Sequence, residues 1–280
     1  MGSLRILDLH FGGRPKGIGV YLVDTDDGIA LFDCGPSSTL HELDARLSEE
    51  GLALTDVRHL LLSHIHLDHA GAAGSIVRRH PALTVWVSQV GAPHLVDPSR
   101  LERSARRLYG GLFEPLWGEL APVPEANVRI AAGDVLGWEA FPTVGHASHH
   151  VSYLRDGTLL AGDACGVRIP PARYVLPVCP PPDLDVEAWH ATAAEIRRRD
   201  PDRLALIHFG VHEDVGEHLD GLEAELDRWV ERAARGMDVE EFSANARADM
   251  GPYADSFDSV APLWQSYAGL QRYLEKQAAA

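Results

Sequence analysis

The pattern of apolar and polar positions in the first 90 residues predicts strands that alternate with helices. Short apolar runs bounded by turn residues predict strands at 4–9, 18–23, 28–32, 57–62 and 83–87. The Asp27-Gly28 step is typical of a hairpin that joins the second and third of these strands. Leucines at 40, 43 and 47 recur at helical spacing, so we expect a helix over 39–50 and a further one over 70–79.

The same alternation continues through the middle of the chain. Helical pieces are expected between 97 and 125, followed by strands at 128–130, 138–143, 151–154, 158–160 and 204–207. The segment 169–182 is dense in proline and is expected to be irregular. A helix is predicted over 187–199. Strands alternating with helices indicate an α/β layered fold.

From Val215 onward the pattern becomes purely helical. One helical face is traced by Leu219, Leu222, Leu226, Trp229 and Ala233. Asp238 and Glu241 resemble a capping box, and a final helix through Leu274 carries Pro262 in its first turn.

Charge and cysteine content narrow the classes of partner. The chain has 25 Lys and Arg against 41 Asp and Glu, which gives a net charge of −16 at pH 7. Such a protein repels phosphate backbones and anionic membranes, so we expect neither nucleic acid nor a membrane as partner. The three cysteines form no disulfide framework, and the first residues show no secretory signal. A cytoplasmic protein is expected.

Four side chains of metal-binding type lie within six positions, at His64, His66, Asp68 and His69. They follow a predicted buried strand and precede a helix expected to begin at Ala70. A tight loop there can turn the first two side chains toward one metal ion and the next two toward a second. Imidazole and carboxylate ligands suit zinc, iron, manganese or nickel.

This run resembles the H-x-H-x-D-H motif of the metallo-β-lactamase superfamily, glyoxalase II-like proteins included. Further segments match that family in order, namely Phe32-Asp33-Cys34-Gly35, Thr143-Val144-Gly145-His146, Gly162-Asp163 and Ile207-His208-Phe209-Gly210. The resemblance implies an αββα sandwich with an added C-terminal helical segment. We expect a catalytic domain at 1–235 and a helical extension at 236–280, which packs on that domain or forms a homodimer contact.

The resemblance also implies a dinuclear site. Its two divalent transition metals would be Zn2+, with iron or manganese as alternatives. His64, His66 and His146 would hold one ion, Asp68, His69 and His208 would hold the other, and Asp163 would bridge the two. Such a pair activates a bridging hydroxide, which points to hydrolysis of a small ester-like or thioester-like substrate. Asp68 or Asp163 is the expected proton shuttle.

The substrate stays open at this point. An iron-dependent oxidoreductase of the same fold, a lactonase and a phosphodiesterase are the alternatives. Gly166 stands where many lactonase relatives have Tyr, and Val144 stands where glyoxalase II relatives have Pro.

Other side chains are candidates for supporting the ligands or for binding an anionic small-molecule substrate: Asp33, His150, Arg14, Lys16, Arg168, Arg173 and Tyr174. His212 is expected on the surface, and His218 on the surface or in packing.

Overall fold

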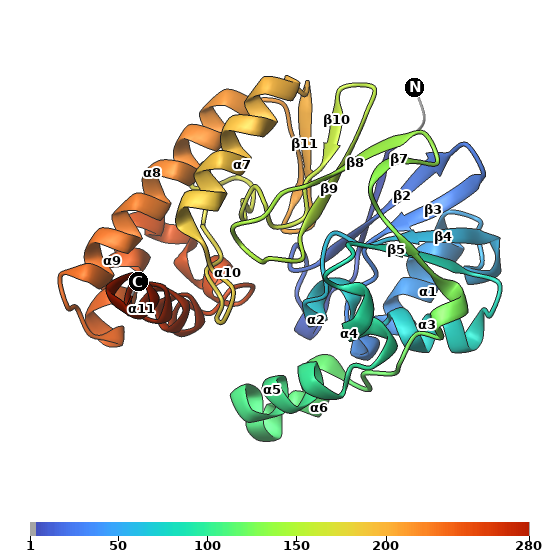
Figure 1. Cartoon of the computed structure of the whole chain (residues 1–280), viewed down its shortest axis with the longest axis horizontal. Helices are drawn as coiled ribbons and strands as arrows, with labels where there is room; N and C mark the ends of the chain where they lie inside the picture. The colour runs from blue at the N-terminus through green and yellow to red at the C-terminus, as the bar shows by residue number, and fades with distance from the viewer. Residues whose placement is uncertain (1–3, 280) are drawn as a thin grey trace. The chain divides into compact units, whose positions relative to one another are not determined.

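The apolar runs predicted as strands are strands in the computed structural model, which describes residues 4–279 (Figure 1). Contacts between residues divide the chain into two units. The first comprises the chain up to Pro142 together with His149–Asp156. The second comprises Thr143–Ser148 and the chain from Gly157 onward.

The first unit contains a sheet whose order follows the sequence. Among the described residues its strands are β1 (Arg5–Asp8), β2 (Gly19–Thr25), β3 (Gly28–Phe32), β4 (Val57–Leu61), β5 (Thr84–Val87) and β6 (Val128–Ile130). β1, β2 and β3 pair antiparallel, and β3 to β6 pair parallel. The predicted hairpin is confirmed, with Thr25 opposite Gly28. The parallel strands require crossover segments, which carry the helices of this unit.

Those helices are α1 (Leu40–Glu49), α2 (Leu67–Ala70), α3 (Ala73–Arg79), α4 (Ala92–Val96), α5 (Ser99–Tyr109) and α6 (Phe113–Trp117). α1 buries Leu43 and Leu47, as their spacing predicts. The helix predicted over 70–79 is present as α3, which begins three residues later than predicted, and a separate short helix, α2, ends at Ala70. α2 begins at Leu67, so Asp68 and His69 lie in a short helix and not in a loop.

An antiparallel meander completes the first unit. Its strands are β7 (Gly133–Val135), β8 (Trp138–Pro142) and β9 (Val151–Arg155). β7 contains only one large apolar residue, Val135, so the pattern does not predict it. β9 packs on the first sheet through Tyr153, whose hydroxyl donates to the Leu62 carbonyl at 3.0 Å and whose ring meets Phe32 edge-on.

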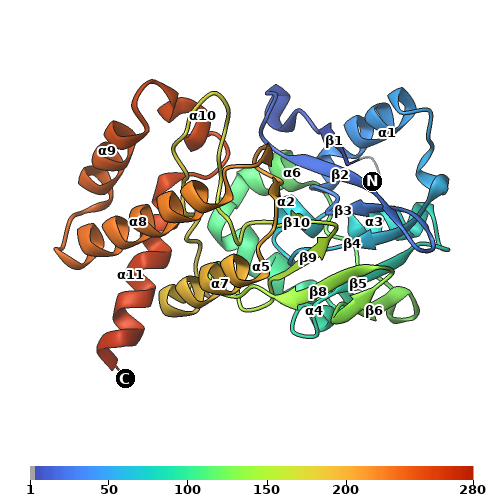
Figure 2. The same cartoon turned by 90° about the horizontal axis from the view of Figure 1, so that it is seen from above.

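The second unit is dominated by helices. β10 (Thr158–Leu160) pairs parallel with β11 (Arg203–Leu206), which pairs antiparallel with β12 (Gly210–His212), a three-residue strand that the pattern also does not predict. Its helices are α7 (Val186–Arg199), α8 (Val215–Ala234), α9 (Val239–Met250), α10 (Ala254–Asp258) and α11 (Leu263–Ala279). α8 buries the predicted apolar face and contacts α7, α9 and α11 (Figure 2).

Helix boundaries in the second unit follow ordinary capping chemistry. Asp238 accepts a hydrogen bond from the Glu241 amide at 2.8 Å and so caps α9. Pro262 directly precedes α11, one position earlier than predicted.

The predicted fold class is confirmed. The described strands belong to two mixed sheets flanked by helices, and helices α8–α11 follow them. The division at residue 235 remains a prediction. Phe242, Phe257 and Leu270 of the proposed extension share one apolar cluster with Trp189 and Trp229.

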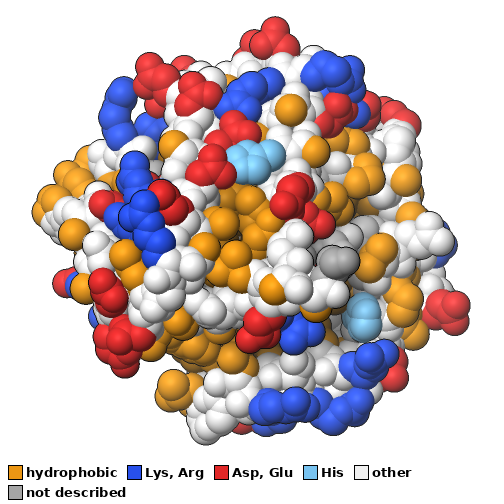
Figure 3. Space-filling view, turned by 60° about the vertical axis from the view of Figure 1, so that its left-hand side comes forward, with side chains coloured by type: hydrophobic (Ala, Val, Ile, Leu, Met, Phe, Trp, Pro, Cys, Tyr) orange, Lys and Arg blue, Asp and Glu red, His pale blue; other side chains and the backbone are white. Residues whose placement is uncertain are grey.

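Two surface properties bear on partners. Among residues 4–279, no helix has both the length and the apolar character needed to cross a bilayer. Acidic and basic side chains are interspersed with hydrophobic ones on the face drawn in Figure 3.

Candidate metal centre

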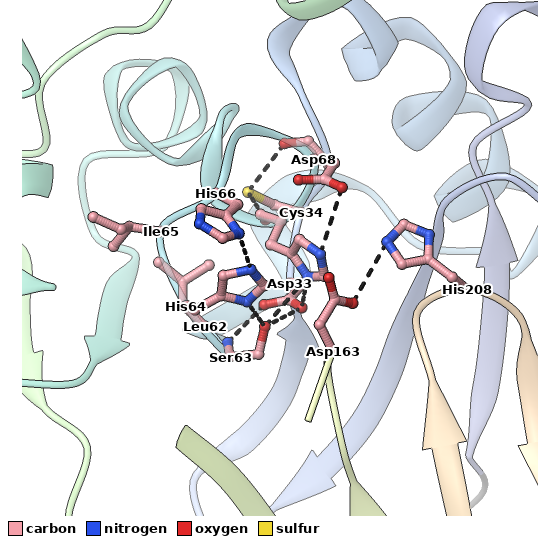
Figure 4. A network of polar contacts seen from close by, with 12 residues as sticks. Asp33, Cys34, Leu62, Ser63, His64, Ile65, His66, Asp68, Asp163 and His208 are labelled. Carbon is pink, nitrogen blue, oxygen red and sulfur yellow. Dashed lines mark hydrogen bonds and ion pairs between the residues drawn. The ribbon is translucent and has the colours of Figure 1, made fainter. Parts of the chain in front are cut away.

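The His64–His69 run follows β4 in the first unit, and its last three residues lie in α2. Its four polar side chains form two pairs, and Figure 4 labels three of them, His64, His66 and Asp68. His64 Nε2 and His66 Nδ1 are 2.8 Å apart. Asp68 Oδ2 and His69 Nε2 are 3.7 Å apart. Each pair brings two potential ligand atoms close together.

The buried carboxylate of Asp33 holds the segment that carries these histidines in place. Asp33 adopts the left-handed backbone conformation, with φ of 59°, directly after β3. Its carboxylate accepts hydrogen bonds from the Ser63 amide and the Ser63 hydroxyl, both at 2.7 Å, and from His69 Nδ1 at 2.8 Å. Asp33 thus holds Ser63 and the His69 ring, and its role in supporting metal ligands remains a prediction.

These contacts test whether the histidines suit a metal. With Nδ1–H of His69 donated to Asp33, Nε2 keeps its lone pair. His64 Nδ1 lies 2.9 Å from the Ser63 hydroxyl, which itself donates to Asp33, so His64 Nδ1 is the donor and Nε2 again keeps a lone pair. A ligating histidine whose second nitrogen donates to an oxygen is the usual arrangement at metal sites. The residues present therefore fit a metal ion.

In the second unit, Asp163 lies between two histidines. Asp163 Oδ2 is 3.4 Å from His146 Nε2, and Asp163 Oδ1 is 3.6 Å from His208 Nε2. All three side chains are buried. His146 Nδ1 donates to the Val178 carbonyl at 2.7 Å and so frees Nε2 as a ligand. One carboxylate with an oxygen toward each of two imidazoles has the geometry of a bridging ligand.

Helix α7 supports this second set. Gly145 has φ of 134°, and a Cβ there would lie 2.4 Å from Trp189, so the turn before His146 sits directly on α7. Trp189 Nε1 donates to the Ala164 carbonyl at 2.7 Å, and its ring meets that of His146 edge-on. Thr192 donates to the Val144 carbonyl at 2.6 Å.

All seven predicted ligands belong to His and Asp groups of a kind that can hold metal ions, and these clusters are consistent with a dinuclear site.

The other predicted site residues differ in their surroundings. His150 is buried and stacks on His64, with ring centroids 4.9 Å apart. Arg14 and Lys16 are exposed, and the Lys16 amide donates to Asp8 at 2.7 Å. In the second unit, Arg173 is exposed and pairs with Glu217, whereas the Tyr174 ring packs against Phe257.

Arg168 is not an exposed cation. Its guanidinium is buried and holds both carboxylate oxygens of Asp214, at 2.8 and 2.9 Å. Hydrogen bonding to Arg168 lowers the pKa of Asp214 to about 2. The sequence pattern did not connect these residues, because 46 positions separate them.

Two histidines near this pair are also buried. The prediction that His212 lies on the surface is wrong, because its ring contacts His218 and its Nε2 lies 3.2 Å from the Phe209 carbonyl. Burial lowers the pKa of His218 to about 4, so its ring is neutral at pH 7. His218 Nε2 donates to the Cys165 carbonyl at 2.8 Å.

The cysteines close to Asp33 and Asp163 in the sequence, Cys34 and Cys165, are buried thiols. Burial, with a smaller contribution from Asp33, raises the pKa of the Cys34 thiol well above its usual value. Burial raises the pKa of Cys165 to about 12. Among the described residues, neither thiol belongs to a group of side chains that could hold a metal ion.

Comparison with known sequences identifies the group to which these motifs belong. The sequence profile described as the metallo-beta-lactamase superfamily matches residues 14–208. YobT of Bacillus subtilis is 27% identical over 156 residues, which cover 54% of this chain and 63% of YobT. "Probable metallo-hydrolase Rv2300c" of Mycobacterium tuberculosis is 29% identical over 175 residues, which cover 52% of this chain and 56% of that protein. The match thus spans about three fifths of these curated relatives.

Solved structures share the architecture. ST1585 from Sulfolobus tokodaii aligns with a TM-score of 0.63 and 20% identity over 98% of both chains. TTHA1429 from Thermus thermophilus aligns with a TM-score of 0.69 and 20% identity over 99% of this chain and 94% of its own. TTHA1623 in a di-iron-bound form aligns with a TM-score of 0.53 and 24% identity over 75% of this chain and 93% of its own. At these identities the likeness establishes the fold alone.

Proposed function

The chain belongs to the metallo-β-lactamase superfamily, and from this premise we propose that it is a dinuclear metal-dependent hydrolase of a small ester-like or thioester-like substrate. The observation that carries the proposal is the Asp163 carboxylate, which directs one oxygen toward His146 and the other toward His208. A carboxylate so placed suits two ions and not one.

The family motif assigns the remaining ligands. His64, His66 and His146 would hold one ion, and Asp68, His69 and His208 the other. Zinc suits this mixture of imidazole and carboxylate ligands, and iron and manganese suit it as well. When bound, two such ions activate water and polarise a carbonyl or phosphoryl oxygen.

The chain's own residues orient the ligands and handle the proton. Asp33 and Ser63 hold His64 and His69 with their Nε2 atoms unprotonated. The Asp163 carboxylate is buried, whereas 24% of the Asp68 side chain is exposed. Asp68 is therefore the better placed to take a proton and pass it to solvent.

We propose a small molecule, not a nucleic acid, as substrate because the net charge is −16. The exposed Arg14 and Lys16 are the candidates for contacting an anionic group on it. Lactone and phosphodiester substrates are alternatives that the same ligand set supports.

Iron-dependent redox chemistry is a second candidate function. The structural relative TTHA1623 has been solved in a di-iron-bound form, and the coenzyme F420H2 oxidase of Methanothermobacter marburgensis is 26% identical over 149 residues, which cover 52% of this chain and 34% of that enzyme. Oxygen consumption that requires iron, without hydrolysis, would support this function in place of ours.

Metal analysis and a substrate panel test the proposal. We expect two transition-metal ions per chain after reconstitution with Zn2+, and turnover of at least one ester, thioester, lactone or phosphodiester. His66→Ala should abolish turnover while the protein stays folded. His41→Ala, which alters a histidine that is 77% exposed, should not. Fewer than one bound metal per chain, or full turnover by His66→Ala, would overturn the proposal.

A further inference from the structure

The backbone of Arg168 is hydrogen-bonded to the turn that contains His208 and Phe209. The Arg168 amide donates to the His208 carbonyl at 2.7 Å, and the Phe209 amide donates to the Arg168 carbonyl at 3.1 Å. The carbonyl and the amide that make these two hydrogen bonds belong to the single peptide that links His208 to Phe209, so both of its polar groups are bound by Arg168. The position of Arg168 therefore restricts where the His208 main chain can lie.

The Arg168 side chain is held in turn by helix α8. Its two terminal nitrogens donate to the two Asp214 oxygens, and one of them also lies 3.4 Å from His218 Nδ1. Because the His218 ring donates through Nε2 to the Cys165 carbonyl, its neutral Nδ1 can accept from Arg168. A planar guanidinium that is held bidentately has little rotational freedom.

Asp214 pairs with Arg168 and does not cap its own helix through its side chain. It occupies the N-cap position of α8, where an aspartate usually accepts a hydrogen bond from its own helix. In the described part of the chain, Asp214 makes no such side-chain cap hydrogen bond. Both of its oxygens accept from Arg168 instead. The carboxylate at the start of α8 thus serves the segment after Asp163, not its own helix.

That segment also packs closely on α8. Gly166 has φ of 67°, and a Cβ added there would lie 2.6 Å from the Leu176 carbonyl oxygen and 2.9 Å from Leu222 Cδ1. Leu222 is a fully buried residue of α8. The main chain at Gly166 thus lies directly against α8, with no space for a side chain between them.

We propose that Arg168 and Asp214 form a positioning pair through which α8 sets the place of the His208 imidazole. Neither residue touches a metal ion or substrate in this role. The part of the inference that concerns metal affinity rests on the proposed function, in which His208 is a ligand. The part that concerns the His208–Phe209 main chain does not.

Two variants and one matched control test the pair. Asp214→Asn removes the charge and one acceptor oxygen, and Arg168→Lys keeps the charge but loses the bidentate contact. Arg173→Lys is the control, because Arg173 also joins this segment to α8, through Glu217, but is 80% exposed. In the metal-free protein, we expect amide hydrogen exchange at Phe209 to rise at least tenfold in both test variants and to stay unchanged in the control.

Chelator competition on the zinc-loaded proteins gives the second measurement. We expect one of two bound ions to be held about 10–100-fold more weakly in both test variants, as for other groups that orient a ligand, and the other ion to be unaffected. Circular dichroism and the midpoint of thermal unfolding show whether each variant is folded.

The outcomes separate the two proposals. If wild-type protein binds no metal, the proposed function fails, and the exchange of Phe209 still decides the positioning role. Unchanged exchange at Phe209 in either folded test variant overturns the inference, as does an equal rise in Arg173→Lys. A general loss of stability without a local change at Phe209 also overturns it.

Discussion

The two sets of proposed metal ligands in this protein are built in opposite ways. The set in the first unit, at His64–His69, comes from six consecutive residues and is oriented mainly by Ser63, its immediate neighbour, and by Asp33. The set in the second unit comes from three separate turns. Its supports are the Val178 carbonyl, Trp189 of α7 and the start of α8.

This difference has a consequence for stability and metal binding. Side chains near one another in sequence keep most of their geometry as long as their strand and short helix form. Ligands from distant turns depend on every helix that holds those turns. We therefore expect the first set to respond only to changes in its own neighbourhood, and the second to respond to changes in α7 and α8.

The largest effect is expected where a single side chain serves two ions. Asp163→Asn replaces one of the two carboxylate oxygens with an amide that donates and cannot ligate. We expect at most one bound metal per chain in place of two. Turnover should fall by more than about 100-fold, which is more than the loss expected when a residue that only hydrogen-bonds to a ligand is changed. Asp156→Asn, at a carboxylate that is 70% exposed, is the control and should change neither value. Two metals retained by Asp163→Asn would contradict the bridging role.

A smaller and more local effect is expected at Asp33. Asn tolerates the left-handed backbone of this position, so Asp33→Asn changes the chemistry without straining the turn. Its amide group would face hydrogen-bond donors, which should lower the free energy of unfolding by about 1–3 kcal/mol. Metal affinity at the first set should fall by about 10–100-fold.

Denaturant unfolding, metal titration and amide exchange measure these changes in the Asp33→Asn protein. Exchange at Phe209 should be unchanged, since the second set has separate supports. Asp44→Asn, at an exposed carboxylate paired with Arg79, is the control. A rise in amide exchange at Phe209 in Asp33→Asn would show that the two ligand sets are coupled, and would contradict the expectation that their supports are separate.

The smallest effect is a dependence on pH in the second unit. Because Arg168 lowers the pKa of Asp214 to about 2 from a usual value of 3.8, the pair stabilises the fold above pH 4. That stabilisation, about 1–2 kcal/mol after allowance for partial exposure, is lost as pH falls from 4 to 2. The difference in unfolding free energy between wild type and Asp214→Asn should therefore be larger at pH 6 than at pH 3. An equal difference at the two pH values would contradict this ion pair.

Much of the fold could be predicted because burial follows simple periods. The hairpin at Asp27-Gly28 and the apolar face of α8 are confirmed. Strands β7 and β12 each contain a single large apolar side chain, Val135 and Val211, and the helix at Leu67 begins inside a polar motif that masks its helical spacing. The pattern therefore missed these elements, although it predicted the equally short strands β6 and β10.

For the site, the amino-acid sequence by itself determined the kinds of ligand and their order. A metal site is predicted by His64, His66, Asp68 and His69, because four metal-binding side chains rarely occur within six positions by chance. Only the tertiary structure decided how each ligand is held. Asp33 reaches His69 across 36 positions, and Asp214 reaches Arg168 across 46. Hydrogen bonds between distant segments leave no periodic trace in a sequence, because they depend on where two turns meet in space.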